Sequence, residues 1–179
     1  MKRLLSGRQV ATALDHLCKA TISQLPPDPR IAVIGMRTRG QVLAERLIKR
    51  LRAEKPTLRI DRGVLDITFY RDDLARQRGA PVVRATEIDF DLDDAWVLLV
   101  DDVLQTGRSI RAALDALMDL GRPRVVRLAV LVDRGDRELP IVADFIGKRL
   151  KAKSTDRIQV KLKETDGEDG VFIIPASAS

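Results

Sequence analysis

The segment 97–109 constrains the fold more than any other part of the sequence. It begins with a continuous apolar run, Val97–Val100, and a strand without a polar face is typical of the centre of a parallel sheet. A polar stretch follows, and apolar residues at helical spacing begin at Ile110. The segment therefore predicts a buried strand, a polar loop and an amphipathic helix, in that order.

The rest of the chain repeats this alternation of strand and helix. In chain order, the spacing of apolar residues predicts a helix over 10–22, a strand over 31–34, a helix over 43–51, a strand over 64–70, a helix over 110–118 and a strand over 125–132. The charged stretch 71–81 predicts a mobile loop. Such alternation indicates an α/β fold with a doubly wound, mainly parallel sheet and a ligand site beyond the carboxyl ends of its strands. Without a break in composition over 179 residues, we expect a single domain, 1–179.

The polar part of the segment 97–109 is suited to a sugar phosphate. It ends in residues that bring hydroxyls and backbone N–H groups to a helix N-terminus: Thr106, Gly107, Arg108 and Ser109. Free N–H donors and the helix dipole favour a phosphate there. Asp101 and Asp102 stand just before them, where carboxylates can accept hydrogen bonds from ribose hydroxyls or bind a metal. An acidic strand end with an ordinary helix cap is the alternative.

A second candidate anion site follows the strand predicted over 31–34. Gly35 and Gly40 bracket two guanidinium groups, those of Arg37 and Arg39. Arginine is well suited to phosphate because its planar donors bind two oxygens at once. The alternative is a solvated basic turn.

Composition narrows the functional classes. The chain has one histidine, His16, and one cysteine, Cys18, so histidine-based hydrolase chemistry and a zinc site are disfavoured. A net charge of +6 favours an anionic partner, either a phosphorylated metabolite or a nucleic acid. The apolar runs are far shorter than the roughly 20 residues of a membrane helix, and the N-terminus lacks a secretory apolar core. We therefore expect a cytoplasmic protein without a membrane partner.

Four segments together resemble the type I phosphoribosyltransferases, and beyond them the family of pyrimidine operon regulators and uracil phosphoribosyltransferases. These segments are Met36–Gly40, Asp66–Leu74, Val97–Ser109 and Leu131–Pro140, which follow one another in the family's order. The resemblance implies the type I phosphoribosyltransferase fold, with a small hood formed by parts of 133–174. It also implies a site for 5-phosphoribosyl-1-pyrophosphate (PRPP) together with Mg²⁺.

The resemblance assigns roles around PRPP. The implied catalytic residues are Asp101, Asp102, Arg39 and Arg71, with Mg²⁺ on the two acids and partly on PRPP. The implied phosphate-binding residues are Thr38, Arg39, Gly40, Val103, Leu104, Gln105, Thr106, Gly107, Arg108 and Ser109. Arg39 is expected to contact the departing pyrophosphate. Arg71 belongs to a flap that closes over PRPP, where it would stabilise pyrophosphate as the bond breaks.

The resemblance also favours a pyrimidine base. Relatives that act on oxopurines carry an acid just before the Thr-Gly pair, and Gln105 occupies that position here. We therefore expect uracil as substrate and UMP as product, with another base such as orotate or hypoxanthine as the rival. The expected base contacts lie in the hood segments: Asp133, Arg134, Arg137, Ile158 and Val160. Surface charges are the alternative for Arg134, Arg137 and Lys148.

Many members of that family also bind the leader transcript of the pyrimidine operon. Lys19 and Arg137 are the candidate RNA contacts in this chain. Three positions differ from the residues that contact RNA in the regulators, which weakens the expectation of RNA binding. Asp15, Asp136 and Val142 stand where the regulators carry threonine, histidine and arginine, respectively. Enzyme activity therefore ranks first, an enzyme that also binds RNA second, and a regulator without turnover third. The resemblance further implies a homodimer or homotetramer, and we expect the tail 175–179 to be disordered.

Overall fold

The computed structural model describes residues 1–27, 30–72 and 85–176. The strands are β1 (Lys2–Ser6), β2 (Ile31–Met36), β3 (Ile60–Leu65), β4 (Trp96–Leu104), β5 (Val125–Asp133), β6 (Phe145–Arg149), β7 (Arg157–Lys161) and β8 (Gly170–Ile174). The helices are α1 (Gly7–Ser23), α2 (Arg39–Glu54), α3 (Arg108–Leu120) and α4 (Lys163–Asp166), with a 3-10 turn, η1, at Thr68–Tyr70.

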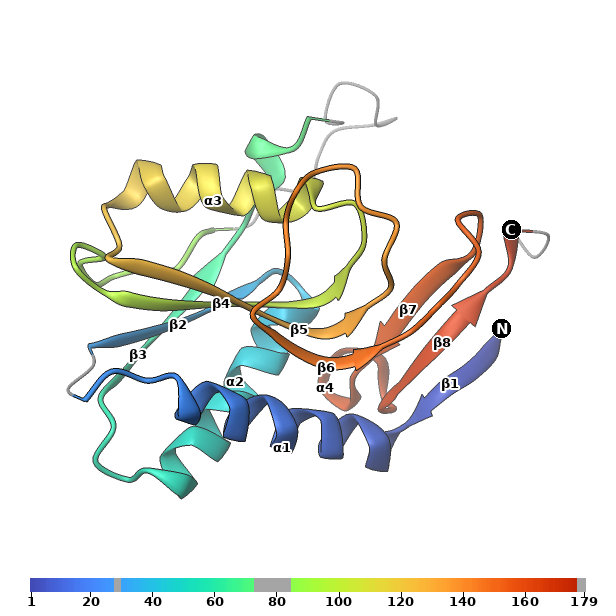
Figure 1. Cartoon of the computed structure of the whole chain (residues 1–179), viewed down its shortest axis with the longest axis horizontal. Coiled ribbons are helices and arrows are strands. Elements are labelled where there is room, and N and C mark those ends of the chain that lie inside the picture. Colours follow the sequence, from blue (N-terminus) through green and yellow to red (C-terminus); the bar gives the residue numbers. More distant parts are fainter. Residues whose placement is uncertain (28–29, 73–84, 177–179) are drawn as a thin grey trace.

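A five-stranded parallel sheet in the order β3-β2-β4-β5-β6 forms the centre of the molecule. Helices α1 and α2 cover one face of this sheet and α3 covers the other (Figure 1). One apolar cluster, around Leu14, Leu47 and Leu98, lies on the α1–α2 side, and a second, around Leu99 and Leu117, lies on the α3 side. Burial from both faces explains the uninterrupted apolar sequences of β2 and β4. The predicted α/β fold is confirmed.

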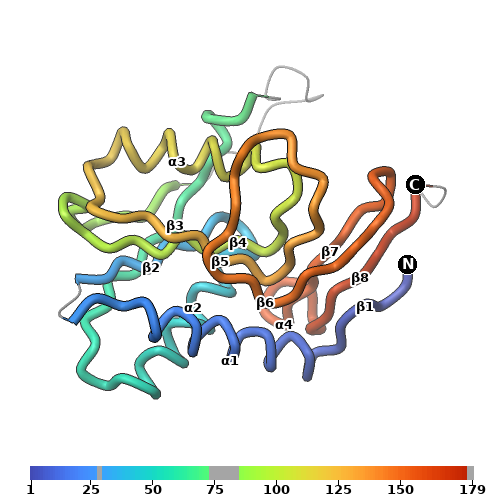
Figure 2. The backbone as a smooth tube through the Cα atoms, viewed as in Figure 1, coloured from blue at the N-terminus to red at the C-terminus, as the bar shows by residue number. Residues whose placement is uncertain are grey.

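A second, three-stranded antiparallel sheet, β1-β8-β7, extends from one end of the main sheet. The two ends of the described chain therefore lie beside each other, with Lys2 opposite Ile173 (Figure 2). This sheet and α4 form the hood. Its strand β1 comes from residues 2–6, outside the range 133–174 expected for the hood, where no strand is predicted from the sequence. A short segment of two basic and two leucine residues without alternation has no strand signal of its own.

The strand predicted over 64–70 is wrong in its position. β3 runs over Ile60–Leu65, because its register with β2 pairs Ile31 with Ile60, and polar residues are tolerated at the edge of the sheet. The chain then turns, since the Asp66 carboxylate accepts hydrogen bonds from the backbone N–H and the hydroxyl of Thr68. The loop predicted over 71–81 lies largely, and the tail over 175–179 partly, outside the described residues.

β4 is longer than the strand predicted over 97–100. It continues through Asp101 and Asp102 and ends at Leu104, paired with β5 as far as Asp133. The two acids therefore belong to the strand and are held by its ladder. The helix α3 begins at Arg108 and ends before Gly121, in agreement with the sequence.

Candidate functional site

Two adjoining cavities open at the carboxyl ends of β2 and β4. The loop cavity, of about 360 Å³, follows the end of β4 and the start of α3 and reaches the hood. The turn cavity, of about 450 Å³, lies between the end of β2, the residues after β3 and the end of β4. Both cavities are lined by Asp101, Asp102, Val103 and Ser109. One elongated ligand can therefore occupy both cavities and cross the acid pair.

The loop between β4 and α3 provides the wall of the loop cavity. Apart from Arg108, every residue of 103–109 lines this cavity. Gly107 has a φ of +91°, a left-handed conformation that favours glycine and that directs the chain into α3. The start of α3 thus lies beside the cavity, where its Arg108 N–H donates to the Thr106 hydroxyl at 3.3 Å and the next backbone N–H groups are available to an anion. The Arg108 guanidinium turns outward and pairs with Glu138 and Asp72, each at 2.6 Å.

The acid pair at the end of β4 is held by the backbone. The Asp101 carboxylate accepts a hydrogen bond from the Asp102 N–H at 2.8 Å, and the Asp102 carboxylate accepts one from the Val103 N–H at 2.9 Å. Burial raises the pKa of Asp101, and the neighbouring charge of Asp102 raises it further. Burial also raises the pKa of Asp102, although the positive charge of Arg39 opposes this shift. A ligand that offers hydroxyls or positive charge would stabilise both acids in their ionised form.

The turn 36–40 joins β2 to α2 beside the turn cavity. Arg37 and Thr38 line this cavity, and the peptide bond between them is cis. The Arg37 N–H donates to the Leu65 carbonyl at 3.0 Å, which fixes the turn against the end of β3. Gly40 allows the first turn of α2 to lie against β4, since a Cβ there would come within 2.5 Å of the Val100 oxygen. Glycine at this position is therefore required by packing.

Arg39 lines neither cavity and is engaged by the hood. Its Nε and Nη2 donate to the two carboxylate oxygens of Asp166 at 3.2 and 2.7 Å. This bidentate pair lowers the pKa of Asp166 to about 2. Arg71, in contrast, lines the turn cavity opposite the acids. The structure thus brings Thr38, Arg71 and the acids around one cavity, whereas Arg39 is paired with Asp166.

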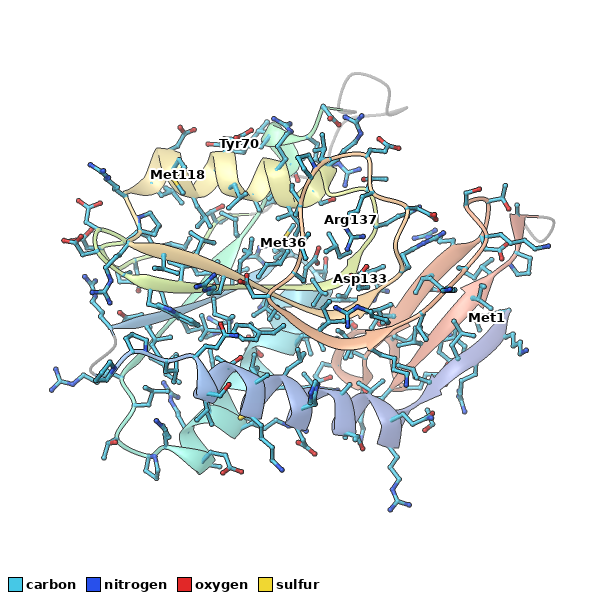
Figure 3. The ribbon with its side chains drawn as sticks, in the orientation of Figure 1. Met1, Met36, Tyr70, Met118, Asp133 and Arg137 are labelled. Atoms are coloured by element: carbon cyan, nitrogen blue, oxygen red, sulfur yellow. The ribbon has the colours of Figure 1, made fainter. Side chains whose placement is uncertain are left out.

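The five residues expected to contact the base lie in different surroundings. Ile158 and Arg134 line the loop cavity, whereas Val160 is buried in the apolar core. Arg134 is 4% exposed, and its guanidinium donates to the carbonyls of Asp156 and Lys153. Asp133 and Arg137 line neither of these two cavities, and they form an ion pair at 2.7 Å (Figure 3). Arg134 and Arg137 are therefore not surface charges.

Arg157 is a cavity residue that the sequence analysis does not identify. It lies at the start of β7, next to Ile158, and lines the loop cavity. Within the described part of the chain, no hydrogen bond or ion pair engages its guanidinium. No motif marks this arginine, and its only signal in the sequence is its position beside a candidate base contact.

The candidate RNA contacts do not share a surface. Lys19 is exposed on α1, which covers one face of the main sheet, whereas Arg137 lies in the loop after β5, on the side of α3 (Figures 1 and 3). Asp15 pairs with Arg50 at 2.7 Å, and Asp136 pairs with Arg134 at 2.9 Å, so neither aspartate is an isolated negative charge. Val142 is 77% exposed.

The described residues form neither a membrane-spanning helix nor a cluster of metal-ligating side chains. No described helix is long and apolar enough to cross a membrane. Residues 1–27, 30–72 and 85–176 contain no group of three or more His, Cys, Asp or Glu side chains placed to hold a metal ion. The acid pair at the end of β4 would therefore need ligand atoms from elsewhere to bind a metal.

The sequence is similar to those of known proteins over most of its length. The phosphoribosyl transferase domain family matches residues 1–162. The bifunctional protein PyrR of Deinococcus radiodurans is 51% identical over 93% of this chain and 90% of its own length. The bifunctional protein PyrR of Roseiflexus sp. is 48% identical over 99% of this chain and 97% of its own length.

Solved structures with the same fold share much less sequence. The hypoxanthine phosphoribosyltransferase of Trypanosoma cruzi superimposes with a TM-score of 0.70 at 16% identity, over 98% of this chain and 97% of that one. The enzyme of that name from Staphylococcus aureus gives a TM-score of 0.69 at 16% identity, over 95% and 91%. The chain therefore belongs to the phosphoribosyltransferase family, and within it to the group whose members are named bifunctional protein PyrR.

Proposed function

We propose that this phosphoribosyltransferase transfers the phosphoribosyl group of PRPP to uracil and forms UMP and pyrophosphate. The observation that carries the proposal is the pair of cavities that meet at Asp101 and Asp102. PRPP has a phosphate at one end, a ribose in the middle and a pyrophosphate at the other end. The two cavities offer an N–H-rich loop, an acid pair and an arginine-containing turn in the same order.

Each part of PRPP has a partner of suitable chemistry. The 5-phosphate accepts hydrogen bonds from the N–H groups and hydroxyls of the loop that ends in Thr106 and Ser109. The ribose hydroxyls donate to the carboxylates of Asp101 and Asp102. The pyrophosphate occupies the turn cavity with Thr38 and Arg71. Arg39 reaches the pyrophosphate only if its pair with Asp166 opens, and otherwise acts through its positive charge on Asp102.

The reaction needs positioning and charge stabilisation more than a nucleophilic side chain. The bond between ribose C1 and the pyrophosphate oxygen breaks, and its electron pair leaves with the oxygen. Uracil N1 forms a bond to C1, and the N1 proton is lost to water. Positive charge develops on the ribose, where the carboxylates of Asp101 and Asp102 stabilise it, while Arg71 stabilises the departing negative charge.

The acid pair also fits Mg²⁺ bound together with PRPP. Carboxylate oxygens are the ligands that Mg²⁺ prefers, so Asp101 and Asp102 would hold the ion, and oxygens of PRPP would supply further ligands. When bound, the ion offsets the negative charge of the pyrophosphate. The residues of this chain hold the two carboxylates in place through the N–H groups of Asp102 and Val103.

Uracil is proposed from the loop and from the family resemblance. Gln105 lines the loop cavity at the position where relatives that act on oxopurines carry an acid. A neutral amide there provides no base to deprotonate a purine. Ile158 and Arg157 bound the hood side of the same cavity, where the base would lie.

A substrate panel tests this proposal. The purified protein is given PRPP and Mg²⁺ with uracil, orotate, hypoxanthine or guanine, and each nucleotide is measured by chromatography. We expect UMP alone to accumulate. Turnover of a different base would refute the assignment of uracil, and PRPP binding without turnover of any base would refute the enzymatic proposal and leave the regulator.

Binding of a leader transcript is the second candidate function. The relatives are named bifunctional, the chain carries a net charge of +6, and Lys19 is exposed on α1. An RNA contact through phosphate should weaken steeply with salt and should respond to uridine nucleotides. We expect Lys19→Glu to lower affinity for the transcript without changing UMP formation. Affinity that is insensitive to salt would contradict this second function.

A further inference from the structure

Three successive carbonyl groups, those of Leu104 at the end of β4 and of Gln105 and Thr106 in the loop before α3, face one neighbouring segment, residues 134–141. Leu104 O accepts a hydrogen bond from the Arg134 N–H at 3.1 Å. Thr106 O accepts two, from the N–H groups of Glu138 and Leu139, at 3.0 and 3.1 Å. Gln105 O, between them, accepts a hydrogen bond from a side chain, the Arg137 guanidinium, at 2.7 Å.

Each of the three guanidinium nitrogens of Arg137 donates to an acceptor within the protein. Its Nη1 donates to Gln105 O and, at 3.4 Å, to Leu104 O, and its Nε donates to Ile141 O at 2.9 Å. Its Nη2 donates to the Asp133 carboxylate at 2.7 Å, which fixes the plane of the guanidinium (Figure 3). The side chain is only 22% exposed. Arg137 is therefore poorly placed to contact a base or an RNA phosphate.

The direction of these carbonyls determines where the loop amides point. In a planar trans peptide the C=O and the following N–H point in opposite directions. Carbonyls of Leu104, Gln105 and Thr106 that face the segment 134–141 therefore direct the N–H groups of residues 105–107 away from it. Residues 105–107 all line the loop cavity, so their N–H groups lie at its wall. Donors that are already oriented stabilise a bound anion without reorganisation.

We infer that Arg137 is a positioning residue for the 5-phosphate of PRPP: it holds the carbonyl side of the phosphate loop so that the loop amides face the ligand. The inference rests on the proposed PRPP site and changes the expectation from sequence, in which Arg137 contacts the base or RNA. Lysine cannot replace Arg137, because its ammonium group is a single donor centre. Only the planar guanidinium has separate nitrogens that donate at the same time to the loop carbonyls, to Ile141 O and to the Asp133 carboxylate.

The test compares Arg137→Lys and Arg137→Ala with the wild type and with a control, Arg124→Lys, in an exposed arginine at the amino end of β5. Binding of PRPP and of ribose 5-phosphate is measured by calorimetry, and KM values for PRPP and uracil are measured separately. Both Arg137 variants should weaken PRPP and ribose 5-phosphate by at least roughly tenfold, the scale of a lost charged hydrogen bond. In both Arg137 variants, KM for uracil should change less than about twofold. In the Arg124→Lys control, both KM values and both binding constants should change less than about twofold.

Each outcome decides the inference. A wild type that binds no PRPP refutes the proposed function itself, before any variant is considered. If the wild type binds PRPP and Arg137→Lys binds it equally well, the positioning role is wrong. A lower melting temperature with unchanged KM values would show that Arg137 has a structural role only. A rise confined to KM for uracil would show that Arg137 contacts the base. Either result would overturn the inference.

Discussion

At the scale of single residues, Asp102 combines a backbone contact with an unfavourable environment for its charge. Its carboxylate accepts the Val103 N–H, while burial raises its pKa. Asp102→Asn keeps the side-chain volume and removes the charge that would stabilise the ribose. We expect the rate of UMP formation to fall by roughly 100-fold or more, the scale of a lost electrostatic contact in a transition state. The melting temperature should change little.

The matched control for that variant is Asp89→Asn, at an exposed aspartate outside both cavities. Its initial rate should equal that of the wild type. An Asp102→Asn variant with the wild-type rate would remove the acid pair from the proposed mechanism, whatever the control shows.

Arg157 carries a second prediction at this scale. Its guanidinium lines the loop cavity beside Ile158, where it can donate to a carbonyl oxygen of the base. Arg157→Gln should raise KM for uracil by roughly tenfold, as expected for the loss of one charged hydrogen bond, and leave KM for PRPP nearly unchanged. Arg149→Gln, at an exposed arginine on β6, is the control. Equal changes in both KM values would show that Arg157 does not act on the base.

At the scale of elements, the turn at α4 holds the hood against α2. Asp166 accepts both Arg39 donors and the Leu162 N–H, and Asp169 and Glu164 pair with Arg46. Because the pKa of Asp166 falls from its usual 3.8 to about 2, the ionised form stabilises the fold. We expect a contribution of at most about 2 kcal/mol, since solvent screens part of this ion pair, fully present above roughly pH 4 and lost as the pH falls toward 2.

Urea unfolding of Asp166→Asn and wild type at several pH values tests this contact. The variant should be less stable by at most about 2 kcal/mol at pH 7, and the difference should shrink as the pH falls from 4 to 2. Asp61→Asn is the control, since its pair with Arg30 spans 3.7 Å between exposed side chains and should contribute under about 0.5 kcal/mol. A difference that stays constant with pH would show that the Asp166 charge is not responsible.

At the scale of the whole molecule, the hood and the main sheet share one apolar core. Leu5 of β1 is 5% exposed and belongs to the same cluster as Leu14 of α1 and Val171 of β8. Leu5→Ala should lower the free energy of unfolding by about 2–4 kcal/mol. Fluorescence of Trp96, the only tryptophan, reports the main sheet, so its transition should shift if both sheets unfold together.

The control for this variant is Leu120→Ala, at a leucine that is 47% exposed at the end of α3. Its free energy of unfolding should stay within about 0.5 kcal/mol of the wild type. A Trp96 transition unchanged by Leu5→Ala would mean that the hood unfolds separately from the main sheet.

Local patterns in the sequence predict the apolar core of β4, the loop that follows it and the helix α3, because apolar periodicity and turn residues act over neighbouring positions. The α/β fold and the meeting of Asp101 and Asp102 with that loop at one cavity follow from this local order. The pairing of β1 with β8, the contact of Arg39 with Asp166 across 127 positions and the contacts of Arg137 with loop carbonyls are seen in the folded structure alone. These contacts join segments that are distant in the sequence and depend on how the segments pack. Apolar periodicity reports only local structure, so it does not identify the residue that a side chain contacts in the folded protein.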